Sequence, residues 1–184
     1  ILAKINLILQ DLSHLSGSPL IFDGDGLAIL PETHVRSEKA VHKFPIVDAI
    51  IMNPPFSRQR DMSDTTISHI EQLMAEYGLT DFIDRKMGLH GYFILHADQF
   101  LKQGGFMSMI LPATTFNADY TKKLLDFLKS RKYSIKYVFE VLSKTNAFSE
   151  DCAFKEYMVV LQKGTYRKED DEIASFISLK DELT

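Results

Sequence analysis

The stretch IVDAIIMNPPF, residues 46–56, joins an apolar run to an asparagine and two consecutive prolines. The run 46–52 predicts a buried strand, because its apolar side chains end abruptly at a strong turn signal. Pro54 and Pro55 lack a backbone N–H and each fixes its own φ at about −65°, so a stiff loop is expected to follow the strand. Ligands bind beyond the carboxyl ends of the strands in open parallel α/β sheets, which makes this loop the first candidate site.

The residue types of the loop suit a planar group that carries an amino function. The prolines leave few donors and leave carbonyls free to point outward, and the side chain of Asn53 adds another oxygen acceptor. Phe56 adds an apolar ring directly after them. The alternative is a turn that only ends the strand, since Asn and Pro both favour turns.

The NPPF loop (residues 53–56), placed after an apolar strand, resembles the catalytic motif of S-adenosylmethionine-dependent amino-group methyltransferases, above all the N6-adenine DNA methyltransferases. The resemblance implies that Asn53 and the carbonyl of Pro54 hold the N6 amino group, within a loop that Pro55 helps to stiffen. Phe56 would stack on the base. The amine would attack the sulfonium methyl in line, and the fixed acceptors would stabilise the charge gained by nitrogen without a separate general base. The implied cofactor is S-adenosyl-L-methionine, and the implied partner is double-stranded DNA.

A second candidate region is the turn DGDG, residues 23–26, which follows the short apolar run 20–22. Glycines allow a ligand to approach the backbone, and a carboxylate accepts hydrogen bonds from an amino group or a hydroxyl. The resemblance implies that Asp25 and Gly26 contact the cofactor, and that the ring of Phe93 lines the cofactor's adenine. The alternatives are a tight acidic turn and an ordinary core residue.

Patterns along the rest of the chain predict further helices and strands. Helices are expected at 1–15, 67–77, 91–102 and 116–132, with Gly104 and Gly105 capping the helix 91–102. Strands are expected at 20–22, 106–111, 135–141, 157–162 and 173–179, and the polar segment 31–45 is expected to be irregular. This order resembles an α/β, Rossmann-like methyltransferase sheet, mostly parallel with an antiparallel final strand and without its first strands.

The segment 143–155 connects two of the expected strands and contains Phe148. In the resembled family, a hairpin at this point supplies an aromatic ring that stacks on the far face of an extruded base, and Phe148 is the implied residue. Chemistry on a duplex base requires such extrusion, and an apolar sandwich helps to offset the cost of unstacking. An anchor that packs the loop onto the core is the alternative for Phe148.

Composition narrows the class of protein. The net charge of −4 argues against a generic polyanion binder, so any surface for nucleic acid must be local. Six basic residues between positions 122 and 136 suggest such a footprint, but a solvated helix face is the favoured interpretation. Cys152 is the only cysteine, which excludes a disulfide framework and a cysteine-based zinc site and fits a reducing, cytoplasmic setting. No metal site and no membrane partner are expected.

The domain organisation is expected to be that of a piece of a longer protein. Residues 1–164 are assigned to part of a catalytic domain, and residues 165–184 to a charged extension that forms an edge strand or a linker. The glycine-rich loop after the first strand and the acidic residue after the second strand, which hold the cofactor in the family, are not found, so the chain alone is expected to bind the cofactor poorly. Specificity and nuclease subunits, or fused domains, are possible partners. A methyltransferase of glutamine amides or RNA guanines, and a non-catalytic assembly subunit, remain alternatives.

Overall fold

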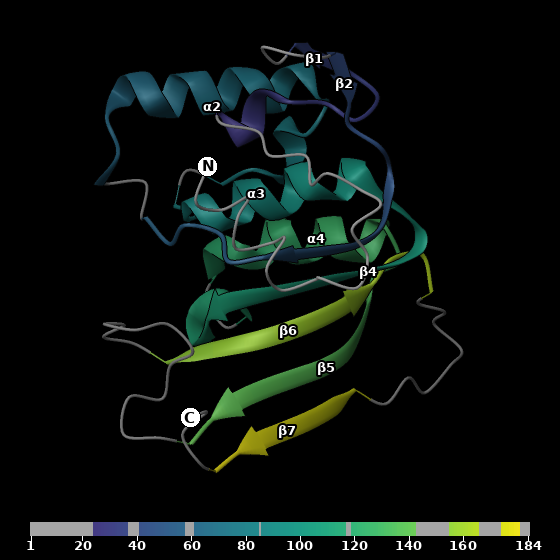
Figure 1. Ribbon diagram of the computed structural model, residues 1–184. Coiled ribbons are helices and arrows are strands. Elements are labelled where there is room, and N and C mark those ends of the chain that lie inside the picture. The colour runs from purple at the N-terminus through teal and green to yellow at the C-terminus, as the bar shows by residue number, and fades with distance from the viewer. Residues whose placement is uncertain are drawn as a thin grey trace, which may run out of the picture.

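The computed structural model describes residues 24–36, 41–57, 61–84, 86–116, 119–142, 155–165 and 174–180. The predicted helix 1–15, the predicted strand 20–22 and Phe148 lie outside these residues. The described part contains a larger and a smaller β-sheet, together with helices that pack beside the larger sheet (Figure 1).

The larger sheet has the strand order β3-β4-β6-β5-β7. Its strands are β3 (Val47–Met52), β4 (Leu101–Pro112), β5 (Ser134–Val141), β6 (Glu156–Gln162) and β7 (Ser175–Leu179). β3 pairs with β4 in parallel, and β5 pairs with β7 in parallel, whereas β6 is antiparallel to both β4 and β5. The protein is therefore an α/β fold with a mixed sheet. The antiparallel strand is β6, whereas β7, the last strand along the chain, pairs in parallel with β5 at the edge of the sheet, which differs from the expected antiparallel final strand (Figure 1).

Alternating side chains of β4 and β6 form the core side of this sheet. Met107 and Met109 of β4 lie opposite Leu161 and Val159 of β6, and all of them are buried. Phe106, which directly precedes Met107, lies on the opposite face of the strand and is 43% exposed. This period of two residues matches a sheet that buries one face against helices.

Helices α2 (Asp64–Glu76), α3 (Leu89–Ala97) and α4 (Lys122–Ser130) form a layer next to the sheet, with α3 between α2 and α4 and α2 farthest from β4 (Figure 1). Helix α2 begins at Ser63, whose hydroxyl accepts a hydrogen bond from the N–H of Thr66 at 3.2 Å. Such an N-cap satisfies a donor that the helix leaves free. Helix α3 is buried on most of its sides, and α4 is amphipathic, with Leu124 and Phe127 fully buried.

The prediction of a helix that runs to residue 102 is wrong. Helix α3 ends at Ala97, a 3₁₀ turn, η4 (Asp98–Phe100), follows, and β4 begins at Leu101. The Nζ of Lys163 donates to the carbonyls of Asp98 and Leu101 at 2.7 and 2.9 Å. These carbonyls bind a lysine from a distant part of the chain instead of helical N–H groups, so the helix does not continue and the residues after Phe100 join the sheet.

The predicted helix cap at Gly104 and Gly105 is also wrong, because both glycines lie within β4. Gly104 has a φ of +79°, and its N–H donates to the carbonyl of Lys163 at 2.9 Å. The register against β3 shifts here, since Val47 faces Leu101 but Ala49 already faces Phe106. A positive φ thus serves a strand irregularity, which is another common use of glycine.

Two further regions differ from the predictions. The segment 31–45 contains a small antiparallel sheet of β1 (His34–Arg36) and β2 (Val41–Lys43) rather than only irregular chain. The region 116–132 begins with the 3₁₀ turns η5 (Ala113–Phe116) and η6 (Asp119–Thr121), and α-helical structure starts only at Lys122.

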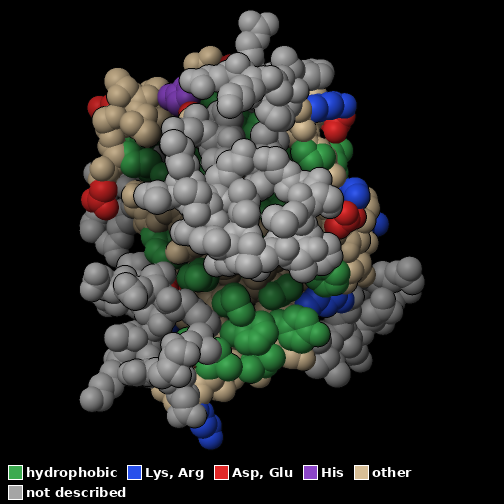
Figure 2. Space-filling view, in the orientation of Figure 1, with side chains coloured by type: hydrophobic (Ala, Val, Ile, Leu, Met, Phe, Trp, Pro, Cys, Tyr) green, Lys and Arg blue, Asp and Glu red, His purple; other side chains and the backbone are tan. Residues whose placement is uncertain are grey.

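Part of the sheet surface is apolar and exposed. Figure 2 shows hydrophobic side chains gathered over the lower strands of the sheet. Among the described residues, exposed large hydrophobic side chains occur on β3, β4, β5 and β7: Ile51, Phe106, Ile135, Tyr137 and Phe176. Helices α2, α3 and α4 therefore leave part of the sheet uncovered.

Candidate functional site

The NPPF loop follows β3 directly, at the carboxyl end of that strand. Asn53 and Pro55 are exposed, Pro54 is buried and Phe56 is half-buried. The carbonyl of Ser57, the next residue, accepts a hydrogen bond from the N–H of Leu89 at 2.9 Å. The loop is thus attached to the beginning of α3, while the amide of Asn53 stays accessible to a ligand.

His90, in the first turn of α3, contacts the loop through Phe56. The two ring centroids are 6.3 Å apart and the ring planes meet at 76°, an edge-to-face arrangement. The Nε2 of His90 lies 3.4 Å from the Oγ1 of Thr115, in η5 beyond the end of β4. Burial lowers the pKa of His90 to about 4, so the imidazole is neutral at neutral pH.

Asp25 stands at the start of the 3₁₀ turn η1 (Gly26–Ala28). Its Oδ1 accepts the N–H of Leu27 at 2.9 Å, and its Oδ2 lies 3.0 Å from the Nε2 of His69 on α2. Both side chains are about half exposed, with 47% for Asp25 and 54% for His69. The carboxylate is therefore fixed in place by two contacts and still reachable from solvent.

Gly26 lies directly against Phe93 of α3. A Cβ built on Gly26 would lie 3.6 Å from the Cε1 of Phe93, which is ordinary van der Waals contact. The structure therefore brings together Asp25, Gly26 and Phe93, the three residues predicted to contact the cofactor. A carboxylate acceptor thus directly precedes, and an aromatic ring lies close to, the same glycine.

Tyr77 and His96 contact the turn η1 and its surroundings. The hydroxyl of Tyr77 donates to the carbonyl of Leu27 at 2.8 Å. The ring of Tyr77 packs on His96 with a centroid distance of 5.3 Å. Burial lowers the pKa of His96, and the carbonyls of Ile29 and Gly26 oppose that shift. The end of α2 and the end of α3 thus hold η1 from two directions.

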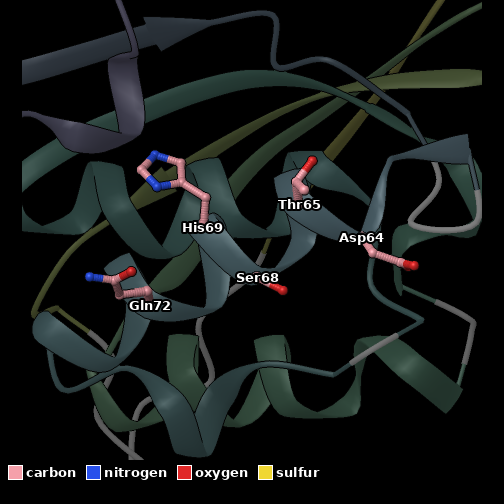
Figure 3. Close-up of a pocket in the computed structure, with 5 residues that line it drawn as sticks. All are labelled: Asp64, Thr65, Ser68, His69 and Gln72. Carbon is pink, nitrogen blue, oxygen red and sulfur yellow. The ribbon is translucent and has the colours of Figure 1, made fainter.

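A shallow hollow of about 420 Å³ runs along α2 beside Asp25. Figure 3 shows five polar side chains that line it, all from α2: Asp64, Thr65, Ser68, His69 and Gln72. His69, which contacts Asp25, connects the hollow to η1. Among the described residues, no group of three or more His, Cys, Asp or Glu side chains is arranged to hold a metal ion.

Sequence reasoning missed His69 and His90. His69 is an exposed residue on a polar helix face, where nothing local marks it as a partner of Asp25. His90 carries a local signal, because it precedes Phe93 by one helical turn and so shares its side of α3. Basic residues of the region 122–136 take part in the packing of the fold: Lys123 donates to the carbonyl of Ile83, and Arg131 pairs with Asp98.

Residues 27–148, which include the NPPF loop and the whole of α3, match the model of the Eco57I restriction-modification methylase family. The chain belongs to this family. It is 27% identical over 177 residues to the Escherichia coli type II restriction enzyme and methyltransferase RM.Eco57I, an alignment that covers 93% of this chain and 16% of RM.Eco57I. The chain thus spans about a sixth of that relative.

Two solved structures resemble this family member to different degrees. A Listeria monocytogenes protein assigned to the class I S-adenosylmethionine-dependent methyltransferases superimposes with a TM-score of 0.54 and 18% identity, over 74% of this chain and 38% of that protein. The type IIG restriction endonuclease BpuSI gives a TM-score of 0.48 and 19% identity, over 67% of this chain and 14% of its own. By the first of these two structures, the mixed sheet of this Eco57I-family chain resembles that of a class I methyltransferase. In its described part, no helix is both long enough and apolar enough to cross a membrane.

Proposed function

We propose that this chain is the part of an S-adenosylmethionine-dependent DNA methyltransferase that holds the target adenine and methylates its N6 atom. The observation that carries the proposal is the position of the NPPF loop. Its Asn53 amide is exposed at the carboxyl end of β3, and the loop is attached to the same helix, α3, that contacts Gly26. The proposed site for an amino group and the proposed site for a cofactor would thus share one helix.

The loop supplies acceptors where positive charge develops. The Oδ1 of Asn53 and the carbonyl of Pro54 accept the hydrogens of the N6 amino group and orient its lone pair away from ring conjugation. The nitrogen becomes positive as the methyl group is transferred, and acceptors that are already in place stabilise this charge without reorganising. Pro55 keeps the loop stiff, and Phe56 covers one face of the base.

The residues around η1 fit the cofactor. The half-exposed carboxylate of Asp25 suits an amino group or a hydroxyl, Gly26 lets a ligand approach the backbone, and Phe93 offers a ring for an adenine plane. S-adenosylmethionine supplies an electrophilic methyl group when it is bound. Asp25 and Phe93 position it, while the NPPF loop positions the acceptor nitrogen.

Double-stranded DNA is the partner that we propose for this site. The Escherichia coli relative is by name both a restriction enzyme and a methyltransferase, which supports DNA over RNA or protein as the substrate. An adenine in a duplex must leave the stack to reach the loop, and Phe56 with Phe148 would enclose it from both faces. Specificity and nuclease functions would reside in other subunits or fused domains, outside residues 1–164.

Methyl transfer to duplex DNA by the complete natural protein tests the proposal. DNA, RNA and release-factor peptides are offered side by side with a labelled methyl donor, and the modified base is identified after digestion. N6-methyladenine in DNA is the expected product, and Asn53→Ala should abolish it. A matched control is Gln103→Ala, which removes an exposed amide near the beginning of β4, at the end of the sheet away from the NPPF loop. Methylation of RNA or peptide but not DNA would overturn the proposal, as would full activity in Asn53→Ala.

A further inference from the structure

His90 is a buried titratable residue next to the NPPF loop, and the chemistry proposed above does not use it. It is only 5% exposed and lies in the first turn of α3. Its Nδ1 has no hydrogen-bond partner among the described residues, and its Nε2 has a single, long contact with Thr115. A buried polar side chain with so little hydrogen bonding is costly, which calls for a function of the ring itself.

The ring of His90 is enclosed on several sides. Phe56 meets it edge to face, and Thr115 lies at its Nε2. Gly88 closes a further side: a Cβ at this position would lie 2.8 Å from both the Nδ1 and the Cε1 of His90. A side chain at position 88 would therefore collide with the imidazole where it now lies, and glycine leaves room for it.

The contacts of His90 join two strand ends. Phe56 belongs to the loop after β3, and Thr115 belongs to η5 after β4, the neighbouring parallel strand. The hydrogen bond from Leu89 to Ser57 ties the same turn of α3 to the same loop. A ring fixed in this way restricts the rotamers that the half-buried Phe56 can adopt.

We propose that His90 is a positioning residue that fixes the ring of Phe56 for stacking on the extruded base, a role that rests on the proposed function. The free energy of binding a base improves when the stacking ring is already held in the bound orientation, because less side-chain freedom is lost on binding. The low pKa of His90 keeps it uncharged, as a ring with no carboxylate partner requires. His90 acts through Phe56 and does not touch the reacting atoms.

A double-mutant cycle in the complete natural protein tests this role. The variants are His90→Ala, Phe56→Ala and the double variant, with a fluorescent adenine analogue at the target position to report base extrusion. His90→Ala should weaken extrusion and lower kcat/KM for DNA roughly tenfold, about the worth of one aromatic contact, with cofactor Kd changed less than about twofold. In the Phe56→Ala background, replacing His90 by alanine should change neither base extrusion nor kcat/KM any further.

Thr115→Val provides a second route if His90→Ala fails to fold, since it removes the hydroxyl at Nε2 and keeps the volume. Thr115→Ser is its matched control, because it retains the hydroxyl. The valine variant should reduce base extrusion only when Phe56 is present, and the serine variant should restore it. If the parent protein methylates DNA but the fold-changes in kcat/KM of His90→Ala and Phe56→Ala simply multiply in the double variant, the positioning role is overturned and the proposed function is not. A parent protein without DNA methylation would overturn the proposed function and this role together.

Discussion

His90 and Phe93 lie one turn apart on α3, and each contacts a different half of the candidate site. His90 meets Phe56 of the NPPF loop, and Phe93 lies against Gly26 at the start of η1. Residues at positions i and i+3 face the same side of a helix. A single helical turn therefore sets the spacing between the proposed base site and the proposed cofactor site, and substitutions at the two positions should have separable effects.

Phe93→Ala should weaken cofactor binding without affecting the base site. The ring offers a planar apolar surface beside Gly26, and its loss should raise the cofactor Kd roughly tenfold, the scale of one aromatic stacking contact. Calorimetric titration of the complete protein with S-adenosylmethionine measures this. Phe106→Ala is the matched control, since that ring is 43% exposed on β4 and points away from the core. Equal losses in both variants would remove Phe93 from the cofactor site.

The variants Asp25→Asn and His69→Ala should distinguish the role of the Asp25 carboxylate in cofactor binding from the role of its partner His69. The asparagine can still accept the N–H of Leu27, so η1 should persist while the negative charge is lost. We expect weaker cofactor binding in Asp25→Asn and a near-normal Kd in His69→Ala. Because both side chains are about half exposed, their mutual contact should contribute at most about 1 kcal/mol to the stability of the fold. A larger loss of affinity in His69→Ala would assign the cofactor contact to the pair.

The position of Asn53 was predictable from the sequence because its signal is local. An apolar run that ends at two prolines strongly favours a strand followed by a stiff loop. The strand β3 ends at Met52, as predicted. The resemblance of the NPPF loop then supplied the family, which the match over residues 27–148 confirms. Asp25, Gly26 and Phe93 were predicted separately, and their contact depends on tertiary structure.

The errors occurred where distant residues decide a local structure. Gly104 follows an apolar helix pattern and reads as a cap, but its positive φ serves β4, since its N–H binds the carbonyl of Lys163. His69 contacts Asp25 across 44 positions of the chain, so no spacing rule reveals the pair. Helix α3 is buried nearly all round, and a helix of this kind has no polar face that would mark its end.

Asp98→Ala should destabilise the fold strongly. Asp98 is buried, and its Oδ1 accepts from the hydroxyl of Tyr133 at 2.9 Å and pairs with the buried Lys163 at 3.0 Å. Removing the carboxylate leaves the lysine charge buried without this partner, which costs about 3–5 kcal/mol. Denaturant unfolding should show this loss. In the matched control Asp48→Ala, whose side chain is 85% exposed and pairs with Lys102, the change should stay below about 1 kcal/mol. Similar losses in both variants would contradict a buried network at the end of α3.

Stability should fall as the pH drops from about 6.5 towards 4, and His90 should account for part of the loss. Burial lowers the pKa of His90 from 6.5 to about 4, so in this range the unfolded chain binds a proton that the folded protein does not. The unfolding free energy therefore decreases as the pH falls through the window, by up to about 3 kcal/mol for a shift of this size, and levels off below the folded-state pKa. Burial also lowers the pKa of His96, which adds a loss of stability of the same sign.

Unfolding midpoints of the parent protein and of His90→Phe, measured between pH 4.5 and 7.5, isolate the contribution of His90. The phenylalanine variant has no proton to bind at this position, so its stability should depend less steeply on pH, and an unchanged slope would show that His90 is protonated equally in both states.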